Sequence, residues 1–183
     1  AKIKDKIGLI KKFAPKVDTF LIGGGIGNTL HFFKGNNISR SFFEPNLESK
    51  VGEILEIAES KMILPLDSKK KDMGNGEFSI LDIGPKTIAK FKDVIAEAKT
   101  IFWNGNMGYS EDKEYEQGTL EIAKSIKENK YIRVVAGGDT VGFLDSHKLL
   151  DGYTFISTGG GAALEFLAGI ELPGLQALGY YKK

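Results

Sequence analysis

Clusters of glycine recur at one kind of place in this sequence, between a short apolar run and a segment that favours helix. Gly23–Gly25, Gly137–Gly138 and Gly159–Gly161 share this position, and a further loop, Asn104–Glu111, also follows an apolar run. Glycine there costs conformational entropy, so it indicates a sharp turn or a close approach to the backbone. If the apolar runs are parallel strands, these loops lie together at one edge of a sheet. The pattern therefore favours an α/β fold.

Short apolar runs alternate along the chain with amphipathic segments of helical periodicity, such as the stripe of Val51, Ile54 and Ala58. The alternation predicts strands at 18–25, 61–67, 100–105, 131–138 and 152–158, and helices at 46–60, 85–99, 117–129, 139–147 and 160–169. Such crossovers produce a parallel sheet covered on both faces. We therefore expect a three-layer, Rossmann-like α/β fold. Residues 67–77 are expected to form a polar, lysine-rich loop, and order is expected to end near Pro173 and Gly174.

Length and composition set broad limits on the class of protein. The 183 residues suit one domain, and the absence of cysteine is compatible with a reducing compartment. A formal net charge of +1 gives no indication of the basic surface with which proteins bind nucleic acid. The sequence contains no apolar run of membrane-spanning length and no secretory leader pattern. We expect a cytoplasmic monomer that binds neither nucleic acid nor membrane, and the abrupt start suggests a fragment.

Two of the glycine clusters precede predicted helices and are candidate anion sites. The first N–H groups of a helix are unpaired and its dipole favours negative charge, by about 0.3–1 kcal/mol per helix. Asp139, directly after Gly137–Gly138, can be read as a Mg²⁺ ligand or as a helix N-cap, and the loop alone slightly favours the cap. Thr140 is open between a hydroxyl donor and a residue that starts the helix.

Other candidates are less specific. The sequence GGGIGN at 23–28 imitates the dinucleotide pattern G-x-G-x-x-G but lacks its last glycine, and the chain has no P-loop motif. Gly23–Gly25 is therefore either a strand-to-helix turn or a flat floor for a planar base. Lys2 and Lys6 could lie beside a phosphate or in solvent. Glu111 is a surface carboxylate or a partner for ribose hydroxyls.

Several stretches together resemble the C-terminal, nucleotide-binding half of the phosphoglycerate kinase family. They are, in chain order, AKIKDKI, LIGGGIGNTL, LDIGPKT, IFWNGNMG, VVAGGDT and ISTGGGAALEFLAGIELPGLQAL. The order and spacing fit along essentially all of residues 1–183, so the resemblance implies one nucleotide-binding domain without the family's N-terminal substrate domain. The chain departs from the usual pattern at Asn106, where the family has proline, and at Ser110, where it often has an aromatic residue.

The resemblance implies a role for each candidate residue. Gly23, Gly24 and Gly25 would form the adenine slot together with Leu81 and Tyr109, and Glu111 would hold the ribose. The phosphates would be bound by residues of four segments, namely Lys2 and Lys6, Asn104, the loop Gly137, Gly138 and Thr140, and the glycines Gly159–Gly161. In this set Lys2, Lys6, Gly138, Gly160 and Gly161 would stabilise the phosphoryl group in transfer. Asp139 would ligate the Mg²⁺ of the nucleotide.

The resemblance also implies the reaction. The intact enzyme would transfer a phosphoryl group between 1,3-bisphosphoglycerate and ADP, giving 3-phosphoglycerate and ATP, with Mg²⁺ as cofactor. The three-carbon substrate would bind through the missing domain, so this chain alone would bind Mg-nucleotide with little activity. Two other hypotheses remain, a non-catalytic nucleotide-binding module and a dinucleotide-dependent oxidoreductase domain.

Overall fold

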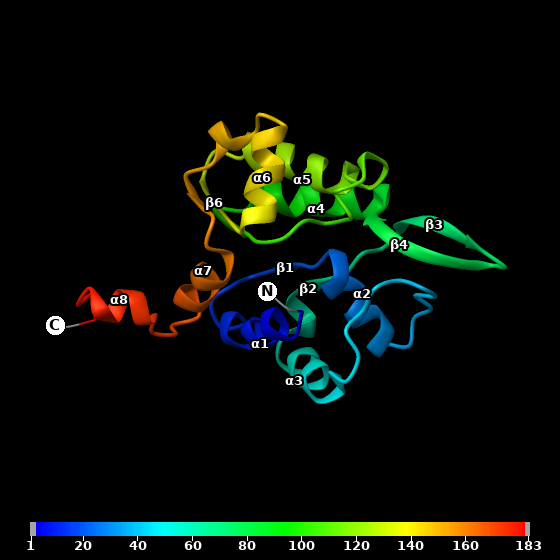
Figure 1. Cartoon of the computed structure of the whole chain (residues 1–183), viewed down its shortest axis with the longest axis horizontal. Coiled ribbons are helices and arrows are strands. Elements are labelled where there is room, and N and C mark those ends of the chain that lie inside the picture. Colours follow the sequence, from blue (N-terminus) through cyan, green and yellow to red (C-terminus); the bar gives the residue numbers. More distant parts are fainter. Residues whose placement is uncertain (1–2, 182–183) are drawn as a thin grey trace.

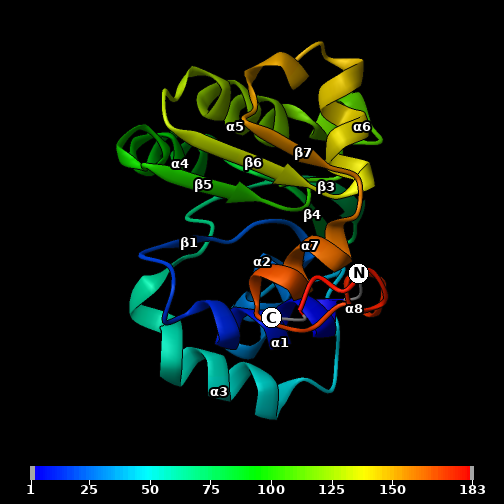
Figure 2. The same ribbon diagram turned by 90° about the vertical axis from the view of Figure 1, so that its left-hand side faces the viewer.

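The computed structural model describes residues 3–181 and places parallel strands between two layers of helices (Figures 1 and 2). Strand β1 (Phe20–Leu21) pairs in parallel with β2 (Met62–Ile63). Strands β5 (Thr100–Trp103), β6 (Ile132–Ala136) and β7 (Phe155–Ser157) form a parallel sheet in that order. The expected α/β fold with a parallel sheet is confirmed.

Helices cover both faces of the strands, as the sequence pattern predicts. Figure 2 shows α4, α5 and α6 on one side of β5, β6 and β7, with α1, α2, α3 and α7 on the other. The helices are α1 (Ile3–Phe13), α2 (Gly24–Phe33), α3 (Glu48–Ala58), α4 (Pro85–Glu97), α5 (Gln117–Glu128), α6 (Gly138–Ser146), α7 (Gly160–Leu167) and α8 (Pro173–Ala177). Single 3₁₀ turns lie at Glu59–Lys61, Lys113–Tyr115 and Leu150–Gly152. Between residues 3 and 181, no helix has the length and apolar character needed to cross a bilayer.

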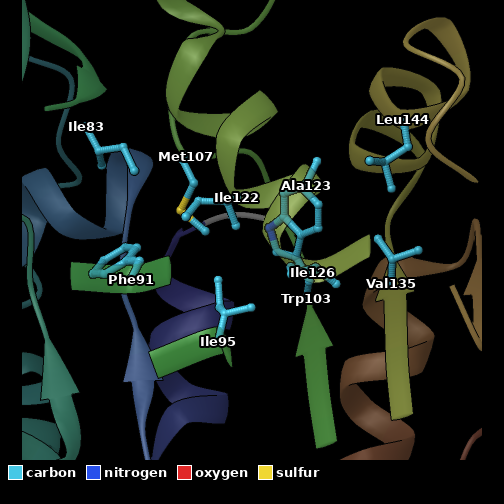
Figure 3. Packing of buried hydrophobic residues seen from close by; sticks show 10 residues of the cluster. All are labelled: Ile83, Phe91, Ile95, Trp103, Met107, Ile122, Ala123, Ile126, Val135 and Leu144. Atoms are coloured by element: carbon cyan, nitrogen blue, oxygen red, sulfur yellow. The ribbon is translucent and has the colours of Figure 1, made fainter. Parts of the chain in front are cut away.

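Two hydrophobic clusters lie on opposite faces of the strands, because alternate side chains of a strand point to opposite faces. Leu21 packs against the cluster formed with α4, α5 and α6, whereas its neighbours Phe20 and Ile22 belong to the cluster formed with α1, α2 and α3. Figure 3 shows the first cluster, which includes Phe91 of α4 and Trp103 of β5. Strand β1 is thus covered on both sides, as is typical of a strand in a parallel sheet, whereas Phe155 of β7 is exposed.

The lysine-rich stretch expected to be a loop is instead an antiparallel hairpin. Strand β3 (Ser68–Gly74) pairs with β4 (Glu77–Ile83), and Figure 1 shows the hairpin projecting from the rest of the chain. Its turn residues Asn75 and Gly76 have φ angles of 53° and 78°. An Asn-Gly pair with positive φ at both residues is the preferred two-residue hairpin turn. The loop prediction was therefore wrong, and the Asn-Gly signal was present in the sequence.

The C-terminal end also differs from expectation. Order was expected to end near Pro173, but Pro173 starts α8, where its fixed φ suits the first helical position. The N–H of Leu172, just before this helix, donates to the hydroxyl of Tyr181 at 3.1 Å. Proline here begins an element.

Candidate functional site

Helices α6 and α7 begin side by side, at the carboxyl ends of β6 and β7. The N–H of Gly137 donates to the carbonyl of Ser157 at 2.9 Å, which ties the end of β6 to that of β7. A Cβ on Gly160 would lie 2.8 Å from Cα of Gly137, closer than real Cβ contacts occur. Gly137 itself has a φ of 113°, which favours glycine. These glycines are thus required for two helix N-termini to meet at one point.

Within the part of the chain that the structure describes, neither helix has a side-chain cap. Gly137 is the N-cap of α6 and Gly159 is that of α7, and neither helix start receives a side-chain cap hydrogen bond among residues 3–181. The capping interpretation of Asp139 is therefore wrong, because Asp139 lies in the first turn of α6 and is exposed. The N–H groups of both first turns stay available to an anion, with two dipoles directed at the same place.

Asn104, which directly follows β5, lies between these two helix starts. Its side-chain Nδ2 donates to the carbonyl of Ala136 at 2.6 Å. The same nitrogen would be 3.0 Å from a Cβ on Gly137 and 2.9 Å from a Cβ on Gly160. Its Oδ1 is buried and has no hydrogen-bond partner within the described part of the chain. Asn104 thus brings the end of a third strand to the same point and leaves an unpaired acceptor there.

Thr140 and Lys6 complete this junction. Thr140 is 1 % exposed, and its hydroxyl accepts a 3.0 Å hydrogen bond from the N–H of Gly105, so it links α6 to the loop after β5. Nζ of Lys6, from α1, would lie 2.9 Å from a Cβ on Gly105. Burial lowers the pKa of Lys6, and the charge of Asp139 partly offsets this effect. A partly desolvated ammonium group and a carboxylate therefore flank the two helix starts.

A pocket of about 510 Å³ lies next to the junction, and Gly24, Leu81 and Tyr109 are among the residues that line it. The N–H of Gly24 donates to the carbonyl of Met107 at 2.9 Å, and a Cβ on Gly23 would lie 2.6 Å from Sδ of Met107. The start of α2 is thus packed against the loop after β5. Of the residues predicted for a base slot, Gly24, Leu81 and Tyr109 come from three distant segments and line the pocket, whereas Gly23 packs against Met107 and does not line it.

The structure separates other predicted residues from this pocket. Glu111 is exposed and does not line the pocket, although it lies only two residues after Tyr109. Gly138 and Gly161 are exposed within the first turns of their helices. Lys2 lies outside the described residues.

Phe42 and Asp82 are among the residues that line the pocket and that sequence reasoning missed. Phe42 is 71 % exposed, and it lies on a loop where no periodicity identifies it. Asp82 is buried at the end of β4, in the stretch LDIGPKT, and its carboxylate contacts the loop that carries Tyr109. The signal for Asp82 was an acidic residue placed between the apolar residues Leu81 and Ile83.

Asp139 is the candidate metal ligand, and its surroundings fit one type of ion. Within residues 3–181, no group of three or more His, Cys, Asp or Glu side chains could enclose a metal. Mg²⁺ at nucleotide sites commonly uses one or two carboxylates together with phosphate oxygens. An exposed carboxylate in the first turn of α6 fits that donor set and does not fit a metal enclosed by protein ligands.

The fold and site define the class of protein. It is an α/β protein whose glycine-rich helix starts gather at the carboxyl edge of a parallel sheet, beside a pocket. The sequence profile of the family described as phosphoglycerate kinase matches residues 1–170. The chain belongs to the phosphoglycerate kinase family.

Curated relatives and solved structures agree with this assignment. The chain is 40 % identical to the phosphoglycerate kinase of Levilactobacillus brevis and 38 % identical to that of Mycoplasmoides gallisepticum, in both cases over 97 % of its own length and 48 % of the relative's. The structure of phosphoglycerate kinase from Coxiella burnetii matches with a TM-score of 0.87 and 34 % identity, over 97 % of this chain and 50 % of that one. The chain thus spans about half the length of the curated relatives it matches.

Proposed function

We propose that residues 1–183 form the nucleotide-binding domain of a phosphoglycerate kinase. The whole enzyme would transfer a phosphoryl group between 1,3-bisphosphoglycerate and ADP, giving 3-phosphoglycerate and ATP. The observation that carries the proposal is the meeting of two uncapped helix starts, at Gly137 and Gly160, around the side chain of Asn104. Membership of the family and the pocket beside this junction support it.

The junction would hold the phosphates. Free N–H groups in the first turns of α6 and α7, including Gly138 and Gly161, would donate to phosphate oxygens, and each dipole would contribute about 0.3–1 kcal/mol. Lys6 would place its ammonium charge beside the same oxygens, and Lys2 would have a similar role. Because burial has already removed part of its hydration, Lys6 would lose little further solvation when an anion arrives.

The pocket would hold the nucleoside. Gly23 and Gly24 would form a flat floor, because a side chain on either would collide with the loop after β5. Leu81 and Tyr109 would line the walls, and Glu111, at the exposed end of that loop, would bind the ribose hydroxyls. Phe42 would also contact the base, since an exposed ring in a pocket wall offers a stacking surface to a planar base.

Asp139 would hold the Mg²⁺ of the nucleotide, together with phosphate oxygens. When bound, the ion would supply positive charge that offsets the charge of the phosphates. The residues of this chain would then orient the nucleotide and stabilise charge as the phosphoryl group moves in line, without a covalent enzyme intermediate. The three-carbon acid would bind outside the segment described here, so the 183-residue chain alone would turn over slowly.

Calorimetric titration of the chain with Mg-ADP tests the proposal. We expect a dissociation constant near 0.1 mM, equivalent to about −5.5 kcal/mol, and no binding of NADH. Asp139→Ala should lower the affinity for Mg-ADP by about tenfold, which is the effect expected when a metal contact is lost. Asp145→Ala is the matched control, because it removes the same charge from the other end of α6 and should leave the affinity unchanged. Absence of heat with Mg-ADP, or equal effects of both substitutions, would refute the proposed site.

A further inference from the structure

One wall of the pocket is a short loop, residues 106–109, whose backbone is fixed from three directions. The carbonyl of Met107 accepts from the N–H of Gly24 at 2.9 Å, and the N–H of Met107 donates to the hydroxyl of Thr119 at 3.0 Å. The N–H of Tyr109 donates to the carbonyl of Leu81 at 2.7 Å. The position of this wall therefore depends on how the start of α5 sits against β4.

The buried carboxylate of Asp82 occupies the space where these three parts meet. Asp82 is 3 % exposed, and its Oδ2 accepts from the N–H of Gly118 at 2.7 Å, at the start of α5. Its Oδ1 accepts from the N–H of Ile83 at 2.8 Å. A Cβ on Gly118, or on Gly108 in the loop, would lie only 2.3 Å from Oδ1. The carboxylate is thus in close contact with both the loop and the helix.

Burying the carboxylate of Asp82 costs desolvation free energy in the free protein. Burial raises the pKa of Asp82 to about 6, although hydrogen bonds from the backbone N–H groups of Gly118 and Ile83 act in the opposite direction. Lys69 on β3, the register partner of Asp82, also lowers its pKa. An apolar side chain of similar size would avoid the desolvation penalty. A costly buried charge next to a pocket indicates a role beyond packing.

We propose that Asp82 is a positioning residue for the nucleoside part of the ligand. By bonding to Gly118 and filling the space beside Gly108, its carboxylate fixes the loop that carries Met107 and Tyr109. This inference rests on the proposed function and specifies which half of the site Asp82 serves. It predicts that a change at Asp82 affects binding in the pocket and leaves the junction of α6 and α7 unaffected.

Two probes separate the halves of the site, namely adenosine for the pocket and Mg-tripolyphosphate for the helix starts. Asp82→Asn preserves the shape but leaves one acceptor oxygen for two N–H donors, so the bonds from Gly118 and Ile83 cannot both persist. We expect the substitution to lower the affinity for adenosine by about fivefold, equivalent to about 1 kcal/mol. The affinity for Mg-tripolyphosphate should fall by less than about twofold. Gly118→Ala should likewise lower the affinity for adenosine more than the affinity for Mg-tripolyphosphate. Its Cβ would displace the carboxylate of Asp82, although Gly118 itself does not line the pocket.

Ile126→Val is the control for general destabilisation. Ile126 is buried in α5, and the substitution should lower the urea midpoint of unfolding without changing the affinity for either probe. The inference would be overturned, while the proposed function stands, if Asp82→Asn lowered the affinities for adenosine and Mg-tripolyphosphate equally. It would also be overturned if both test variants bound adenosine as tightly as the unchanged chain. If the unchanged chain bound neither probe, the proposed function and the inference would fail together.

Discussion

Replacing Gly160 with alanine tests whether close packing of α6 against α7 builds the junction. The new Cβ would lie 2.8 Å from Cα and 3.2 Å from N of Gly137, and 2.9 Å from Nδ2 of Asn104. Two of these three atoms belong to the backbone, so they cannot move aside as a flexible side chain could. The helix starts must therefore separate, and the hydrogen bond from Asn104 to Ala136 must lengthen.

Gly161 provides a matched control for the size of this effect. It is the next residue of the same helix, and nothing lies within 4 Å of a Cβ built on it. Glycine-to-alanine substitution stabilises a compatible helical position by about 0.4–1 kcal/mol, and this gain is common to both variants. Overpacking costs about 1–3 kcal/mol and applies to Gly160 alone. The difference in unfolding free energy between the variants should therefore be about 2 kcal/mol.

Urea unfolding, followed by circular dichroism, measures that difference. With a slope of about 2 kcal/mol per molar, Gly160→Ala should unfold about 1 M earlier in urea than Gly161→Ala. Gly160→Ala should also lower the affinity for Mg-tripolyphosphate more than Gly161→Ala does, because only the change at Gly160 separates the two helix starts. Coincident unfolding curves would refute the argument, since they would mean that the short distances at Gly160 relax without cost.

Two further predictions concern the pH dependence of stability at two carboxylates, Asp82 and Asp67. Because the folded-state pKa of Asp82 is about 6 against 3.8 when unfolded, its protonation favours the native state. The unfolding free energy of the unchanged chain, relative to Asp82→Asn, should fall by about 2 kcal/mol from pH 4.5 to 7.5 in urea titrations, and a flat difference would contradict the burial argument. At Asp67, partial burial raises the pKa, but hydrogen bonds from Thr87 and Lys86 at the start of α4 lower it more. Asp67→Ala should therefore cost about 1–2 kcal/mol at pH 7, and this loss should shrink as the pH falls below 4, whereas a constant loss would exclude a charged cap.

Much of the architecture could be predicted from the sequence because its signals are local. The apolar stripe of Val51, Ile54 and Ala58 predicts the buried face of α3, and Pro85 marks the start of α4. The hairpin of β3 and β4 was missed because a run of three lysines suggested a solvated loop. In the structure Nζ of Lys70 lies 3.8 Å from the ring centroid of Phe78 on the partner strand, so a cross-strand contact accommodates a residue that looks unsuited to a strand.

Prediction of the site was limited by contacts that join distant segments. Glycine clusters predict that loops meet at one sheet edge, since that follows from parallel strands alone. The roles of Asp82 and Thr140 could not be predicted in this way, because each depends on a partner on another element, Gly118 for one and Gly105 for the other. Asp139 looked like a cap because capping is the commoner local use of aspartate, whereas the helix start is occupied by Gly137.

The junction combines three features that lower the stability of the free protein. The helix starts after Gly137 and Gly159 lack side-chain caps within residues 3–181, Oδ1 of Asn104 is buried and unpaired there, and Lys6 is partly desolvated. A phosphate group would reduce two of these costs, because it would accept from the free N–H groups of the helix starts and pair with the ammonium group of Lys6, whereas Oδ1 of Asn104 would need a donor such as a bound water. Their coincidence at one point, fixed by glycines that allow no side chain, is therefore stronger support for a phosphate site than any single motif.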